Sequence, residues 1–130
     1  ALTQYQALDE WMKPNYMQLI DAEKTDFLQT LARNIQRFHA LGMVHRALYP
    51  KHIFINTIQA SQIAVIDLEK ARLTKIGWYR TYFDLAALFR HATWWSKEEQ
   101  LIFFKAYCLK SQLNSCEQWL FRRILKRAAR

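Results

Sequence analysis

The sequence is poor in the residues that interrupt regular structure. Its 130 residues include only two glycines, Gly42 and Gly77, and two prolines, Pro14 and Pro50. An all-β domain needs many tight turns, and tight turns draw on these residue types. A hydrophobic content of 52% and an aromatic content of 15% argue against a disordered segment. We therefore expect a mainly α-helical chain that forms one packed unit.

Cysteine and long apolar runs are scarce as well. Cys108 and Cys116 form no C-x-x-C pair, and this spacing fits the reduced thiols of a cytosolic protein better than a disulfide or zinc framework. No apolar run reaches the ~18 residues of a membrane span, and no signal-peptide pattern opens the chain. We expect a cytoplasmic protein that is soluble or peripheral to a membrane. Because it begins at Ala1 without a methionine, we expect a fragment of a longer protein.

Acidic residues are few throughout, and the basic residues gather in the second half of the chain. The formal net charge is +8, of which residues 1–65 contribute +1 (six basic, five acidic) and residues 66–130 contribute +7 (thirteen basic, six acidic). An anionic partner would therefore meet the second half. The last predicted helix is basic and amphipathic, which suits either an anionic membrane surface or a core-packed helix with a solvated face. Its basic residues are Arg122, Arg123, Lys126, Arg127 and Arg130, and its apolar stripe is Trp119, Leu120, Ile124 and Leu125.

Hydrophobic periodicity predicts one long helix, a hairpin and three further helices. The long helix, 22–40, has apolar residues at helical spacing and Gly42 where a C-terminal cap belongs. Before it we expect a strand at 2–6 and a linker at 7–20 with one helical turn, limited by Pro14. Residues 53–56 and 62–66 read as the hairpin, and helices are expected at 80–92, 97–110 and 115–129.

The loop between the long helix and the hairpin carries a phosphotransferase pattern. It reads His45-Arg46-Ala47-Leu48-Tyr49-Pro50-Lys51-His52, and the second strand ends in Asp67-Leu68-Glu69. Protein kinases place H-R-D-L-x-x-x-N and then D-F-G in this order, the first Asp being the catalytic base and the Asn and second Asp metal ligands. Asp67 follows an apolar strand, so its carboxylate needs a metal, a cation or several donors to offset desolvation.

The stretches HRALYPKHIFI, VIDLEKAR and DLAAL together resemble the lipopolysaccharide kinase family, in particular its InaA-type, Kdo/heptose kinase-like branch, over roughly residues 20–92. The resemblance implies the helical C-terminal lobe of a protein-kinase-like fold. Residues 1–20 would be the hinge or linker, 21–92 the catalytic-loop and metal-loop core, and 93–130 the C-terminal helices. It also implies transfer of phosphate from ATP to an inner-core sugar of lipopolysaccharide, at the cytoplasmic face of the inner membrane.

The resemblance assigns roles residue by residue. His45, Arg46, Ala47 and His52 would form the catalytic loop, with His45 bracing it. Lys51, His52 and Asp67 would lie beside ATP, and Asp67 with His52 beside Mg²⁺; a His at position 52 is common in this family, although magnesium prefers oxygen. His52 could instead hydrogen-bond Asp67 or a phosphate, and Lys51 could be a solvated loop lysine. Asp84 would tie down the backbone of the catalytic loop.

Two departures from the kinase pattern keep alternatives open. Ala47 stands where the catalytic Asp belongs, and loss of a general base costs roughly a hundred- to ten-thousand-fold in rate. The chain also lacks a Gly-rich loop and a V-A-I-K lysine, so the ATP-clamping N-lobe is missing from it. A pseudokinase that serves as an interaction module is the alternative function. A kinase of the aminoglycoside or choline type usually keeps both the Asp and the Asn of the catalytic loop, and this chain has neither. Nucleic-acid binding is a further alternative, supported only by the basic second half.

Overall fold

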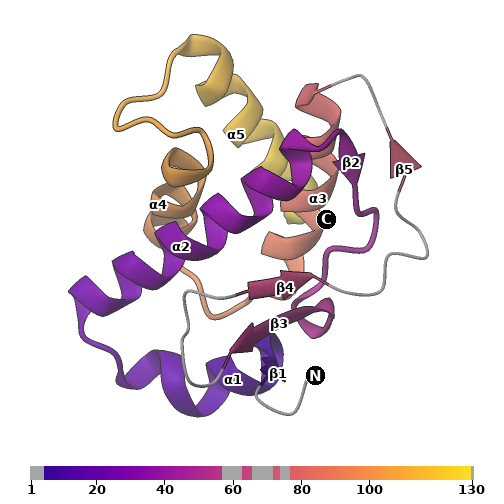
Figure 1. Cartoon of the computed structure of the whole chain (residues 1–130). Helices are drawn as coiled ribbons and strands as arrows, with labels where there is room; N and C mark the ends of the chain where they lie inside the picture. Colours follow the sequence, from indigo (N-terminus) through magenta and orange to yellow (C-terminus); the bar gives the residue numbers. More distant parts are fainter. Residues whose placement is uncertain (1–4, 57–62, 66–71, 74–76, 130) are drawn as a thin grey trace.

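A computed structural model describes residues 5–56, 63–65, 72–73 and 77–129. The architecture is mainly helical, with a small sheet on one side of the helices (Figure 1). This confirms the predicted fold class. The helices are α1 (Leu8–Asn15), α2 (Asp21–Ala40), α3 (Gly77–His91), α4 (Lys97–Tyr107) and α5 (Ser115–Ala128), and two 3₁₀ turns span Tyr16–Gln18 and Pro50–His52.

The predicted hairpin is present and carries a third strand. Strands β3 (Ile53–Asn56) and β4 (Ile63–Val65) are antiparallel, with Ile53 opposite Val65. Strand β1 (Tyr5–Ala7) pairs with the other edge of β3, which gives the order β1-β3-β4. A separate antiparallel pair joins β2 (Met43–Val44) to β5 (Arg72–Leu73), directly before the loop that carries the kinase-like motif.

The core lies between two helix pairs and the sheet. Helix α2 packs along α4, and α3 packs along α5 (Figure 1). The long helix matches its prediction, and Gly42 with a φ of 90° turns the chain away from its end by donating its N–H to the His39 carbonyl over 2.9 Å. The largest fully buried side chains include Tyr16, Phe103, Phe104, Leu28, Leu31, Ile35, Leu48, Ile53 and Leu85.

Helix α1 is longer than the single turn predicted for this stretch. Leu8, Met12 and Tyr16 recur every four residues and are fully buried, so an apolar stripe anchors the segment in the core. Pro14 lies in the last turn, where the loss of one backbone donor leaves the earlier turns intact. The Tyr16 hydroxyl donates to the Glu99 carboxylate at the start of α4.

The last two helices differ in detail from their predictions. Helix α4 ends at Tyr107 and not at residue 110, and Leu109 has a φ of 59° in the turn that follows. In α5 the buried side chains are Phe121 and Ile124, with Leu120 and Leu125 partly buried against the core, whereas Trp119 is 50% exposed. Trp119, which the sequence places on the apolar stripe of this helix, therefore lies outside the core. Its ring lies on the surface, where the Arg123 guanidinium stacks over it at 5.5 Å.

Candidate active site

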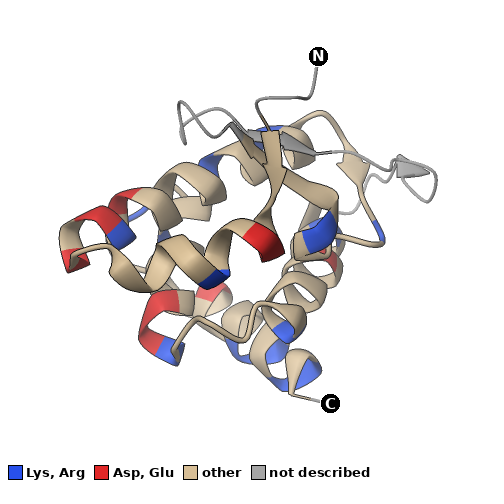
Figure 2. Ribbon diagram, turned by 90° about the horizontal axis from the view of Figure 1, so that it is seen from below, with Lys and Arg blue, Asp and Glu red and all other residues tan. Residues whose placement is uncertain are grey.

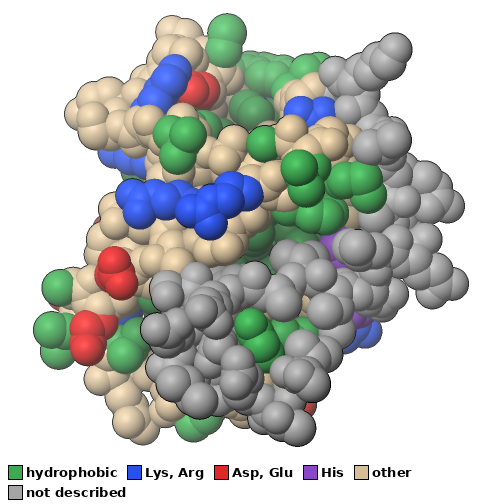
Figure 3. Space-filling model, viewed as in Figure 1, with side chains coloured by type: hydrophobic (Ala, Val, Ile, Leu, Met, Phe, Trp, Pro, Cys, Tyr) green, Lys and Arg blue, Asp and Glu red, His purple; other side chains and the backbone are tan. Residues whose placement is uncertain are grey.

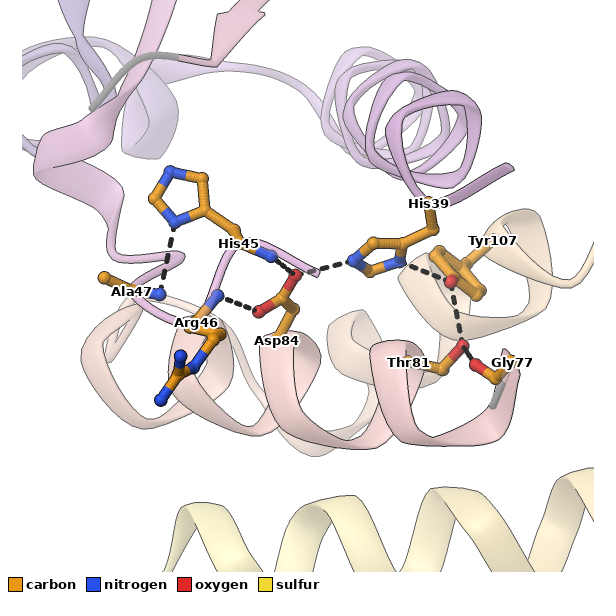
Figure 4. A network of polar contacts seen from close by, with 8 residues as sticks. All are labelled: His39, His45, Arg46, Ala47, Gly77, Thr81, Asp84 and Tyr107. Carbon is orange, nitrogen blue, oxygen red and sulfur yellow. Dashed lines mark hydrogen bonds and ion pairs between the residues drawn. The ribbon is translucent and has the colours of Figure 1, made fainter. Parts of the chain in front are cut away.

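The loop after β2 has a backbone conformation that requires support. Arg46 has a φ of 72°, in the left-handed region that a non-glycine residue adopts only at a cost. Asp84, on α3, supplies the support: its Oδ2 accepts the His45 N–H over 2.7 Å and its Oδ1 accepts the Arg46 N–H over 2.9 Å. This confirms that Asp84 ties down the backbone of the loop (Figure 4).

Asp84 is completely buried, and a third donor helps to offset its desolvation. The imidazole Nε2 of His39, on α2, lies 2.7 Å from Asp84 Oδ2. A carboxylate oxygen can only accept, so His39 carries a proton on Nε2. One carboxylate thereby joins α2, α3 and the loop, and buried charge is tolerated when it is compensated in this way.

The network continues to a tyrosine that the sequence analysis did not single out. His39 Nδ1 lies 2.5 Å from the Tyr107 hydroxyl, which lies 2.8 Å from Thr81 Oγ1 on α3. Burial raises the pKa of Tyr107 to about 12, so its hydroxyl stays protonated at neutral pH. A signal for His39 existed, because it continues the spacing of Leu31 and Ile35 along the apolar face of α2.

His45 and Ala47 lie together under the loop. The His45 ring is fully buried, and its Nδ1 accepts the Ala47 N–H over 3.1 Å, which confirms its role as a brace. Ala47 is 4% exposed and its methyl group offers neither a base nor a hydrogen-bond acceptor. At the position of the catalytic Asp, the loop therefore keeps the backbone geometry and lacks the carboxylate.

His52 faces the same part of the loop. Its Nδ1 lies 2.7 Å from the Ala47 carbonyl oxygen, and its ring stacks on that of His45 with centroids 5.9 Å apart. Because a carbonyl accepts, His52 carries a proton on Nδ1, and in the neutral ring the lone pair is on Nε2. That tautomer suits a cation or a hydrogen-bond donor, whereas a phosphate contact through Nε2 needs the doubly protonated ring.

Lys51 and Asp67 are the remaining predicted site residues. Asp67 lies outside the described residues, and within the described ranges no three His, Cys, Asp or Glu side chains form a group that could hold a metal. His52 by itself is a poor partner for magnesium, which prefers oxygen ligands. Lys51 is exposed, with its Nζ 5.9 Å from the centre of the Tyr49 ring. Its contact with a nucleotide and that of His52 with a metal stay predictions.

A pocket of about 380 Å³ borders the loop on both sides of Ala47. The loop contributes Arg46 and Tyr49 to it. In Figure 4 the Arg46 side chain leaves the loop on the side opposite the His45 ring. The other lining residues come from α3 and α5: Phe83, Ala86, Ala87, Arg90, His91 and Arg127. The stacked rings of His45 and His52 therefore lie on one side of the loop and Arg46 on the other, while Tyr49 borders both, since it lines the pocket and its ring lies 5.6 Å from that of His52.

Surface charge and helix length bear on a membrane contact. Figure 2 shows Lys and Arg recurring on the helical segment that leads to the C-terminus. A band of Lys and Arg also crosses the face drawn in Figure 3. Within the described part of the chain, no helix is both long enough and apolar enough to span a bilayer.

Comparisons with known proteins gave a family match and a structural neighbour. The family model described as "Lipopolysaccharide kinase (Kdo/WaaP) family" matches residues 1–107. A solved structure, "WaaP in complex with acyl carrier protein", superposes with a TM-score of 0.73 at 22% identity, which shows a shared fold. The alignment covers 93% of this chain and 53% of that one, so the chain spans about half the length of its structural neighbour. A comparison with curated proteins gave no match.

Proposed function

Because the chain belongs to the lipopolysaccharide kinase (Kdo/WaaP) family, we propose that it is the C-terminal lobe of a kinase that transfers a phosphoryl group from ATP to a sugar hydroxyl of the lipopolysaccharide inner core. The observation that carries this proposal is the loop of residues 45–52, held by Asp84. Its backbone keeps the support that a phosphotransfer loop needs, since positioning is the largest part of such catalysis.

The residues of this chain have separate tasks under the proposal. Asp84 fixes the His45–Arg46 backbone. The stacked rings of His45 and His52 hold the backbone of Ala47, since His45 accepts its N–H and His52 donates to its carbonyl. Asp67, with His52, would hold Mg²⁺ beside the nucleotide. When bound, magnesium neutralises the charge that develops on the phosphates.

Ala47 sets the expected rate. Without a carboxylate there, the acceptor hydroxyl keeps its proton until late in the transfer, and we expect a rate roughly a hundred- to ten-thousand-fold below that of a site with Asp. The same observation favours the second candidate, a pseudokinase that binds a nucleotide and transfers nothing. Clamping of the ATP phosphates is assigned to an N-lobe, because this chain matches only about half of its structural neighbour.

The proposal includes a place of action at the cytoplasmic face of the inner membrane, in peripheral contact with it. Helix α5 supports this with an outer face that carries Arg122, Arg123 and Lys126 beside the half-exposed Trp119. Basic side chains next to an interfacial tryptophan suit anionic head groups.

The test is phosphate transfer from labelled ATP to purified lipopolysaccharide by the intact protein. We expect slow transfer that depends on magnesium and is lost in Asp67→Asn. The matched control is Asp26→Asn, at an exposed position on α2. Transfer that survives in Asp67→Asn would contradict the assigned metal site. Absence of transfer from the unmodified protein, with magnesium-dependent binding of ATP, would favour the pseudokinase.

A further inference from the structure

The basic pocket is a distinct feature of the catalytic loop. Three arginines from three elements line it: Arg46 from the loop, Arg90 from α3 and Arg127 from α5. Residues far apart in the sequence therefore contribute charge of one sign to one hollow. Among the described residues no carboxylate lines the pocket, and none forms an ion pair with these three arginines.

Two of the arginines have their positions restricted by the fold. The Arg127 guanidinium lies over the rings of Tyr82 and Phe83, 5.4 and 5.1 Å from their centres. Arg46 starts from the backbone that Asp84 holds. A guanidinium that is already placed loses less conformational entropy when it binds an oxyanion, and its planar fork matches phosphate and carboxylate.

The size and place of the pocket indicate what it binds. Its volume of about 380 Å³ falls within the ~300–1,000 Å³ usual for small-molecule sites. It borders the loop at Arg46 and Tyr49, on either side of Ala47, where the acceptor is expected. The proposed nucleotide side is the opposite face, with His45 and His52. An anionic group of the acceptor fits this location better than the phosphates of ATP.

We propose that this pocket binds a phosphate or carboxylate already carried by the acceptor sugar, so that Arg90 and Arg127 select an anionic glycolipid and orient its reacting hydroxyl toward the loop. This inference rests on the proposed function for the identity of the acceptor. The direct contact is between guanidinium and oxyanion, and no bond is made or broken in the pocket.

The test measures binding and not turnover, so that it does not depend on kinase activity. The probe is a lipopolysaccharide core oligosaccharide freed of its acyl chains, used intact, dephosphorylated or with its carboxyl groups reduced. Its Kd for the intact protein is measured by titration calorimetry for the unmodified protein, Arg90→Gln and Arg127→Gln. The matched control is Arg37→Gln, which removes an exposed arginine from α2, outside the pocket.

We expect Arg90→Gln and Arg127→Gln each to raise the Kd of the intact probe about tenfold, as for the loss of one charged hydrogen bond, and Arg37→Gln to leave it within about twofold. Removal from the probe of the anionic group that the pocket binds should raise the Kd for the unmodified protein. With that probe, Arg90→Gln and Arg127→Gln should have the same Kd as the unmodified protein. The chemical treatment that does so identifies phosphate or carboxylate.

Three results would overturn the inference: no binding of the intact probe, no effect of either arginine, or equal losses on the intact and the charge-depleted probes. If both arginines affect the Kd of the anionic probe but the protein transfers no phosphate, the anion site is supported and the kinase activity is refuted. If the protein transfers phosphate but the Kd does not depend on the two arginines, the kinase activity is supported and the anion site is refuted.

Discussion

Asp84 Oδ1 accepts the backbone N–H of Arg46 over 2.9 Å, at the one described residue of the loop whose φ is positive. The other carboxylate oxygen accepts from His45 and His39. A completely buried carboxylate thus stabilises a strained loop while the loop amides and an imidazole compensate its charge. The contribution of this network to stability is measured by unfolding, and its contribution to the site by phosphate transfer.

Asp84→Ala removes the acceptor for three donors at once. Loss of one partner from a buried, charged network typically costs ~3–5 kcal/mol, and we expect a decrease in unfolding free energy of that size, measured by urea denaturation. Asp26→Ala, at an exposed position, should change it by less than about 0.5 kcal/mol. A decrease below about 1 kcal/mol for Asp84→Ala would contradict the role given to this residue.

Tyr107→Phe tests the outer end of the network. It deletes the hydroxyl between His39 Nδ1 and Thr81 Oγ1 and leaves both buried groups without that partner. We expect a loss of about 1–3 kcal/mol in unfolding free energy. Tyr82→Phe is the control, because the Tyr82 hydroxyl has no hydrogen bond to any described residue. Equal effects of the two substitutions would show that the buried hydroxyl contributes nothing specific.

Glu99 makes stability depend on pH. Partial burial acts to raise the pKa of its carboxyl, but hydrogen bonds with Ser96 and Tyr16 and the nearby Lys24 outweigh it and hold the pKa below its ordinary value of 4.5. The folded state therefore binds the proton less readily than the unfolded chain. The stabilisation is present above the ordinary pKa and is lost as the pH falls through the lowered value.

The measurement is the unfolding free energy of Glu99→Gln against the unmodified protein between pH 7 and pH 3. We expect a difference of up to about 1 kcal/mol at pH 7, since the side chain is partly exposed, and its disappearance in acid. Glu98→Gln, at the exposed preceding position, should show a smaller effect at every pH. A Glu99→Gln difference that persisted undiminished at pH 3 would exclude the carboxylate as its source.

The long elements and the motif loop were predictable because local patterns determine them. The periodicity of α2, with Gly42 after it, fixed that helix to within a residue, and the apolar strands gave the hairpin. What the sequence pattern missed are pairings between distant elements. His39 and Tyr107 lie 68 positions apart and meet only because α2 packs along α4.

The basic pocket was missed for the same reason. Its arginines lie on three elements, and the sequence pattern assigned Arg127 only to a basic face of the last helix. The apolar stripe predicted for α5 packs inward at Leu120, Ile124 and Leu125, whereas Trp119 stays on the surface and Phe121 joins the core. Local spacing cannot decide between two such faces when both are partly apolar.

Ala47→Asp is the measurement that tests the kinase assignment most directly. It restores the one carboxylate that the loop lacks, in a backbone already held by Asp84, His45 and His52. The assay is transfer of labelled phosphate from ATP to lipopolysaccharide by the intact protein. The account predicts that the substitution raises the rate about a hundred- to ten-thousand-fold. A folded Ala47→Asp protein with no transfer above background would contradict a phosphotransfer site at this loop.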